Sequence, residues 1–96
     1  MAFKIVVSRN AEIDIAVAYE YYNQFSKQAV KSFRKQLNEC YKNLEKNPFF
    51  QLRYLAVRGL PFQKYPYIVF FKINETTKTV FVLSVFCTHQ NSKKYP

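Results

Sequence analysis

The chain has 96 residues, of which 49% are hydrophobic and 19% aromatic, and its formal net charge is +9. A chain of this length forms one domain, and its hydrophobic content excludes a disordered protein. No apolar run approaches the roughly 20 residues of a membrane span, and no signal peptide is seen, so we expect a cytoplasmic protein. The charge favours an acidic partner, such as nucleic acid, an anionic membrane or an acidic protein.

Residues 3–7 form a short β-rich run, which predicts the first strand. Ser8 and Asn10 are both capable helix N-caps, and the acidic Glu12 and Asp14 suit the positive end of a helix that begins there. Apolar residues then recur at spacings of four and three, which indicates one buried helix face. The members of this stripe are Ala11, Ile15, Ala18, Tyr22 and Phe25.

Ser26 is placed to cap a second helix, which ends at Asn47 because the residue before Pro48 avoids helical geometry. Its apolar stripe consists of Ala29, Phe33, Leu37, Cys40 and Leu44. Its other face carries Lys27, Lys31, Arg34, Lys35, Lys42 and Lys46. No aromatic or Asn/Gln reading pattern lies among these cations, so a solvated surface is favoured over nucleic-acid reading. Membrane binding is disfavoured because the apolar stripe is needed to cover a sheet.

The second half of the chain predicts three strands, at residues 53–58, 67–73 and 79–88, with a polar turn at 74–78. Strict alternation over 53–58 places Arg58 on the sheet face away from the helices. The last two strands are apolar on both faces, which is typical of central strands. Cys40 and Cys87 form no metal-ligand cluster and fit apolar patterns, so we expect free thiols and no metal or cofactor.

The element order β-α-α-β-β-β predicts an α+β fold, with residues 1–96 as a single domain. The economical arrangement has two layers: an antiparallel-rich sheet of about four strands, covered on one face by the N-terminal αα-hairpin.

The order and spacing of several residues resemble the RelE/ParE superfamily of bacterial type II toxin–antitoxin toxins, the plasmid stabilisation type. The carrying residues are Ala11, Asp14, Tyr22, Asn47-Pro48, Val57-Arg58, Leu60, residues 65–71, residues 82–85 and His89. The resemblance implies a RelE-like fold and a growth-inhibiting toxin that an acidic cognate antitoxin neutralises. ParE-like members act on DNA gyrase, and RelE-like members cut mRNA in the ribosome.

Two parts of the sequence depart from the RelE-like pattern and therefore bear on the choice between these activities. The RelE-like pattern has an Arg near the start of the third predicted strand, where this chain has Ile68. More basic residues follow the fourth strand in that pattern, whereas this chain has Phe86-Cys87-Thr88 before His89. We therefore favour a ParE-like mode. A RelE-like mRNA endoribonuclease and a non-toxic basic nucleic-acid-binding module stay as alternatives.

A metal-free ribonuclease needs a base, an acid and a cation for the phosphorane charge. Arg58 and His89, the sole histidine, are the candidate catalytic residues if the chain is a nuclease. Candidate target or nucleic-acid contacts are Arg53, Lys64, Lys93, Lys94 and Tyr95. Structural alternatives stand beside them. His89 would close the edge of the core, Arg58 would pair with Glu75 or cap a chain end, and Lys93 and Lys94 would belong to a solvated tail.

Overall fold

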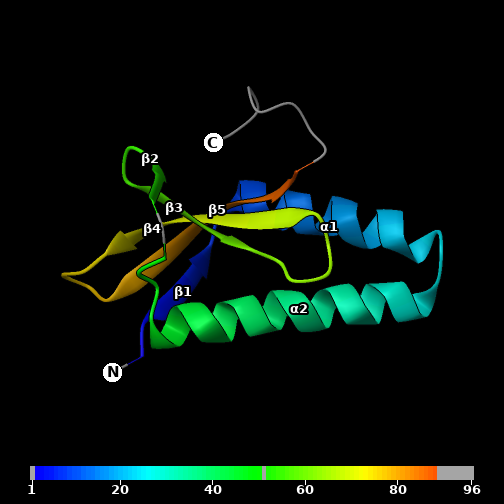
Figure 1. Cartoon of the computed structure of the whole chain (residues 1–96), viewed down its shortest axis with the longest axis horizontal. Coiled ribbons are helices and arrows are strands. Elements are labelled where there is room, and N and C mark those ends of the chain that lie inside the picture. The colour runs from blue at the N-terminus through cyan, green and yellow to red at the C-terminus, as the bar shows by residue number, and fades with distance from the viewer. Residues whose placement is uncertain (1, 51, 89–96) are drawn as a thin grey trace.

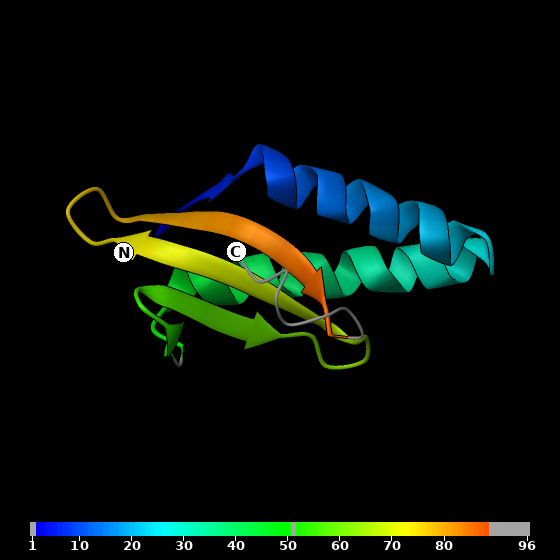
Figure 2. The ribbon, with the colours of Figure 1, turned by 90° about the horizontal axis from the view of Figure 1, so that it is seen from above.

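The computed structural model describes residues 2–50 and 52–88, and for residues 52–54 it describes the backbone alone. The order of elements is β1 (Lys4–Val7), α1 (Arg9–Asn23), α2 (Lys27–Lys46), β2 (Leu52–Tyr54), β3 (Val57–Pro61), β4 (Tyr67–Asn74) and β5 (Thr79–Cys87). The strands form one sheet in the order β1-β5-β4-β3-β2. β1 pairs with β5 in parallel, and the other neighbours are antiparallel. The two helices form a hairpin beside this sheet (Figures 1 and 2). The predicted α+β, two-layer class is confirmed.

Both helices begin at the serines that the sequence indicates. Ser8 Oγ accepts the backbone N–H of Ala11 at 3.1 Å, and Ser26 Oγ accepts that of Ala29 at 3.0 Å. Each bond satisfies one of the donors that a helix start leaves unpaired. Asn10, the other candidate cap, lies within α1.

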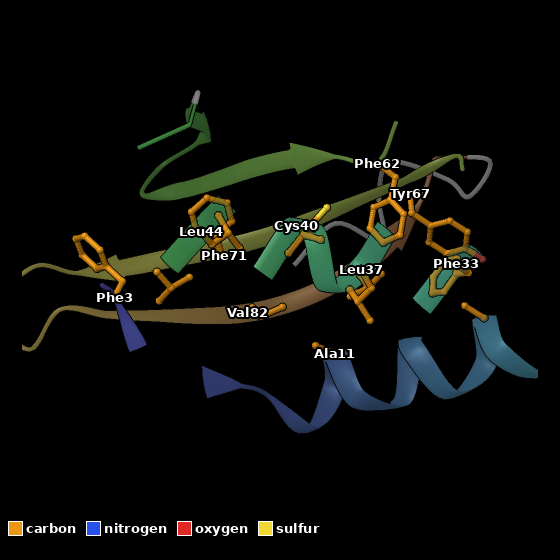
Figure 3. Packing of buried hydrophobic residues seen from close by; sticks show 14 residues of the cluster. Phe3, Ala11, Phe33, Leu37, Cys40, Leu44, Phe62, Tyr67, Phe71 and Val82 are labelled. Carbon is orange, nitrogen blue, oxygen red and sulfur yellow. The ribbon is translucent and has the colours of Figure 1, made fainter. Parts of the chain in front are cut away.

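The main core lies between the helices and the sheet, and Figure 3 shows α2 side chains such as Phe33 and Leu37 within it. Its fully buried members include Ala11, Phe33, Leu44, Val69, Phe71, Val80 and Val82. Burial of each Val, Leu or Phe side chain in this set stabilises the fold by about 1.5–3 kcal/mol. One predicted member of the buried face of the first helix is wrong: Phe25 lies beyond the end of α1 and is 66% exposed.

A bulge in β5 is held by the first helix. Phe70 pairs with Ser84 while Phe71 pairs with Val82, so Leu83 is an extra residue in the ladder. Around this bulge, Ser8 Oγ donates to the carbonyl of Leu83 at 3.1 Å. The start of α1 is thereby fastened to β5, an interior strand of the sheet.

The prediction of one continuous strand over residues 53–58 is wrong. A two-residue turn at Leu55 and Ala56 separates β2 from β3, and Leu55 has a φ of 47°. Two-residue hairpin loops commonly need positive φ, which a pattern of alternating side chains does not reveal. β3 then continues to Pro61, into the segment expected to be a loop. Because the turn interrupts the alternation, Arg58 pairs with Phe71 and shares the helix-facing side of the sheet, not the other side.

Candidate functional site

The sheet face away from the helices, here called the outer face, has a small apolar cluster at its centre. Val57, Phe70 and Phe86 are buried there, and Ile68 and Leu83 pack against them. Lys72 of β4 is exposed and pairs in register with Phe81, which is 40% exposed. The position where a RelE-like nuclease would have Arg is thus Ile68, a member of this cluster.

Arg58 is occupied by a contact with the chain itself. Its guanidinium donates to the backbone carbonyl of Phe50 at 2.8 Å and lies 5.4 Å from the ring centre of Phe49. It therefore fastens the segment after α2 to the start of β3. This arrangement matches neither Glu75 pairing nor a phosphate-binding role on the outer face.

The other predicted site residues are not gathered around Arg58. Lys64 is exposed in the loop after β3, where its backbone N–H donates to Gln36 Oε1 at 3.0 Å. It lies beyond the opposite end of β3 from Arg58. The Arg53 side chain lies outside the described part of the chain, as do His89, Lys93, Lys94 and Tyr95. The pairing of Arg58 with His89 is therefore untested.

An apolar surface on α1 was missed by the sequence analysis. Ile13, Val17, Tyr21 and Phe25 recur at every fourth residue and are 52%, 61%, 51% and 66% exposed. The first three lie along one side of α1 and Phe25 follows just past its end; we call these four residues the α1 stripe. The signal was visible in the sequence as a second set of apolar residues beside the buried face.

The α1 stripe borders a groove of about 680 Å³. Its lining comes from the end of α1, Ala29 of α2, residues 65–67 and Cys87 of β5. A smaller hollow of about 160 Å³ continues past Val17 and Cys87 to Asp14. The walls of this α1 groove are mostly apolar and aromatic, which is the composition of a binding surface.

The aromatic floor of the α1 groove is fixed by ring packing and hydrogen bonds. The Tyr22 ring stacks on that of Phe33, with ring centres 5.4 Å apart, and meets the Tyr65 ring edge-on, with ring centres 5.0 Å apart. Tyr65 Oη donates to the carbonyl of Ala29 at 3.3 Å, which ties the floor to α2. Burial, the nearby Cys87 and hydrogen bonds with Cys87 and Tyr22 raise the pKa of the Tyr67 phenol. The Tyr67 phenol therefore stays protonated near pH 7, and the aromatic floor suits a partner with apolar side chains.

The described residues 2–50 and 52–88 contain no group of three or more His, Cys, Asp or Glu side chains placed to hold a metal ion. Within the same residues, no helix is long and apolar enough to cross a membrane.

Residues 5–92 match the family model described as the ParE toxin of the type II toxin–antitoxin system parDE. The chain belongs to the ParE toxin family. The superfamily resemblance inferred from Ala11, Asp14 and the residues of the sheet is thereby confirmed, and this ParE-family chain is a type II toxin–antitoxin toxin by class. No curated protein is significantly similar to it in sequence.

Solved structures share the fold of this ParE-family toxin. A chain of the chromosomal ParDE system of P. aeruginosa is similar with a TM-score of 0.73 and 19% identity, over 88% of this chain and 94% of that one. A mutant of the E. coli toxin RelE in the free state has a TM-score of 0.62 and 17% identity, over 88% of this chain and 82% of that one. A chain of the RelBE2 complex of Mycobacterium tuberculosis has a TM-score of 0.58 and 11% identity, over 88% and 96%.

Proposed function

We propose that this ParE-family toxin inhibits growth by acting on DNA gyrase in the cytoplasm, without cutting mRNA. The observation that carries the proposal is the outer face of the sheet, where Ile68 and Leu83 join an apolar cluster. Cleavage of RNA needs a cation at the phosphorane, and in the described residues Arg58 is instead held by the Phe50 carbonyl. A surface of this kind suits a protein target better than a cleaved phosphodiester.

Two assays on the purified full-length toxin test this proposal. We expect inhibition of supercoiling by gyrase, together with intact mRNA when the toxin is added to translating ribosomes. Lys72 is the cation that β4 presents on the outer face in the described residues. A Lys72→Ala variant should inhibit gyrase as the wild type does, because the proposed action does not need a cation there. Codon-specific cleavage of mRNA, with gyrase unaffected, would overturn the proposal.

The ribonuclease alternative is supported by the fold shared with E. coli RelE. Its distinguishing result is mRNA cleavage that is lost in His89→Ala. The alternative of a non-toxic nucleic-acid-binding module rests on the net charge of +9. Expression of the chain alone separates it from both toxin hypotheses, because a non-toxic module leaves growth unchanged.

We further propose that the cognate antitoxin covers the α1 groove. Support comes from the ParDE and RelBE systems to which this fold is similar, and from the exposure of Val17 and Phe25 beside the groove. Large apolar surfaces of this kind on a small protein mark interaction sites. The net charge of +9 suits an acidic antitoxin segment, because complementary charge speeds encounter and sets register.

Binding of the co-encoded antitoxin to matched variants tests this site. Val17→Asp places a charge in the α1 groove and should weaken binding at least about tenfold, or about 1.4 kcal/mol. Phe81→Asp places the same charge at an exposed apolar position on the outer face and should bind as the wild type does. Equal effects of the two variants would contradict the assignment.

Alkylation of the free thiols gives a second measurement on the same surface. Cys87 lines the α1 groove and is partly exposed, whereas Cys40 is buried in the core. Bound antitoxin should slow the modification of Cys87, and Cys40 should stay unreactive with and without antitoxin. Unchanged modification of Cys87 in a saturated complex would contradict coverage of the groove.

A further inference from the structure

The exposed side of α2 carries a row of cations that outnumber the acids of the helix six to two. We call this surface the α2 basic face. It presents six exposed cations, Lys27, Lys31, Arg34, Lys35, Lys42 and Lys46. Within residues 27–46 the acids are Glu39 and the half-buried Glu45. In the part of the chain that the structure describes, none of the six cations lies within 4.0 Å of a carboxylate oxygen.

The α2 basic face is long and shallowly hollowed. The helix has 20 residues, so it extends for about 30 Å along one side of the molecule (Figure 1). Two adjoining hollows of about 360 and 270 Å³ lie along it and share Lys31 and Arg34 as lining residues. Glu39 also lines the larger hollow, beside four of the cations. The Arg34 guanidinium lies 5.3 Å from the ring centre of Tyr19, which steadies its position while its side chain stays exposed.

The composition of this face distinguishes between anionic partners. In the described residues, the large apolar side chains that are exposed lie on α1, in loops and on β5, and none lies on α2. A protein partner gains most of its affinity from buried apolar and aromatic anchors, which α2 does not provide. Single-stranded nucleic acid is held by stacking on exposed aromatic rings, which are also absent from this face. A duplex backbone needs only cations and polar donors.

We propose that the α2 basic face binds the phosphate backbone of duplex DNA without reading its sequence. The lack of a base-reading pattern argues against recognition of bases, but backbone contacts need no such pattern. The face lies on the side of α2 opposite the buried Phe33, Leu37 and Leu44, so binding leaves the core intact. This inference goes beyond the action on gyrase and the coverage by antitoxin, and it stands if either of them fails.

The salt dependence of binding to a labelled DNA duplex of about 20 base pairs tests the proposal. If the full-length chain neutralises four or five phosphates, its affinity should fall about 150- to 500-fold between about 50 and 200 mM salt. The triple variant Lys31→Gln, Lys35→Gln, Lys42→Gln should reduce the slope of log affinity against log salt by about 2 to 3, because each lost phosphate contact removes about 0.9. These three side chains are exposed, so the variant should keep the thermal stability of the wild type.

The matched control removes the same net charge from the strands and the turn after β4. Lys4→Gln, Lys72→Gln, Lys78→Gln changes three exposed lysines that do not belong to α2 and should leave the slope nearly unchanged. Equal reductions in the two triple variants would overturn the proposal, because they would indicate diffuse attraction by net charge. Stronger competition by an RNA duplex of the same sequence, or by a poly-glutamate peptide, would also overturn it, as would weak and salt-independent binding.

Discussion

The Asp14 carboxylate of α1 accepts a hydrogen bond from Ser84 Oγ of β5 at 2.9 Å. The same oxygen accepts the backbone N–H of Val85 at 3.1 Å. Ser84 and Val85 are almost fully buried, and they immediately follow the bulged Leu83. A helical carboxylate therefore satisfies donors of β5 that lie beyond the end of its pairing with β1, at Val7 and Val82. This contact gives a structural reason for an acidic residue at this position of the chain.

Replacing Asp14 should destabilise the fold measurably. In Asp14→Ala the Ser84 hydroxyl and the Val85 N–H lose their acceptor, which should lower the free energy of unfolding by about 1–3 kcal/mol. Asp14→Asn retains an acceptor oxygen and should lose less. Urea denaturation measures both changes, and Glu12→Ala, an exposed acid of the same helix, serves as the control. An equal loss in the Glu12 variant would point to charge at the helix start instead of these hydrogen bonds.

Arg58 should behave as a stabilising residue. Arg58→Ala removes the hydrogen bond to the Phe50 carbonyl and the contact with the Phe49 ring. We expect the free energy of unfolding to fall by about 1–2 kcal/mol. Arg58→Lys keeps the charge but should recover only part of the loss, since a lysine lacks the planar fork. A variant with unchanged unfolding and abolished growth inhibition would instead assign Arg58 to the target surface.

The turn between β2 and β3 should be improved by glycine. Leu55 has a φ of 47° and is 90% exposed, so its side chain adds strain to the backbone and little packing. Relief of a strain of about 1–2 kcal/mol outweighs the entropy cost of glycine, about 0.5–1 kcal/mol. Leu55→Gly should therefore raise the free energy of unfolding by about 0.5–1 kcal/mol.

Thermal and urea unfolding check this change, and the neighbouring Ala56→Gly is its control. Ala56 is not among the described residues with positive φ, so glycine there adds the entropy cost alone and should destabilise. Similar losses in both variants would contradict the interpretation of strain at Leu55.

Alkaline pH should destabilise the protein through buried groups on α2. Burial raises the pKa of the Cys40 thiol from 9.0 to about 11 and that of the Tyr41 phenol from 10.0 to about 12. The unfolded chain therefore loses these protons first, and folding favours the protonated forms. The contribution of Cys40 is complete below about pH 9 and is lost as the pH rises through about 11.

Urea denaturation across this range, in the presence of a reductant, measures the effect. The free energy of unfolding should fall with pH, and the fall should be shallower in Cys40→Ala because one of the shifted groups is gone. The alanine variant should also be less stable at neutral pH, since it leaves a small cavity in the core. An identical pH slope in the wild type and the variant would contradict the role of Cys40.

The local elements of this protein were predictable because their signals are local. A serine before each helix and apolar residues at spacings of three and four specify where α1 and α2 begin and which face is buried. The continuous apolar runs of β4 and β5 predict central strands. Residues such as Phe33 and Val82, which lie in the core, follow directly from these patterns.

The candidate sites depended on information that no local pattern contains. The direction of Arg58 follows from a two-residue turn at Leu55 that a continuous strand pattern conceals. The α1 stripe is exposed because the sheet and α2 cover only one side of α1, and its Tyr21 looks from the sequence like an extension of the buried face. The β5 bulge likewise arises from how β5 pairs with β4, and the identity of Leu83 alone does not indicate it.

By itself, the sequence determined the α+β class, the helical hairpin and the basic charge, because spacing, caps and composition are properties of neighbouring residues. Only the tertiary structure decided which faces remain open and which cations remain unpaired. It directed Arg58 to the Phe50 carbonyl and left Val17 and the lysines of α2 at the surface. The physical reason is that burial and hydrogen bonding depend on partners far away in the chain, as Asp14 and Ser84 illustrate.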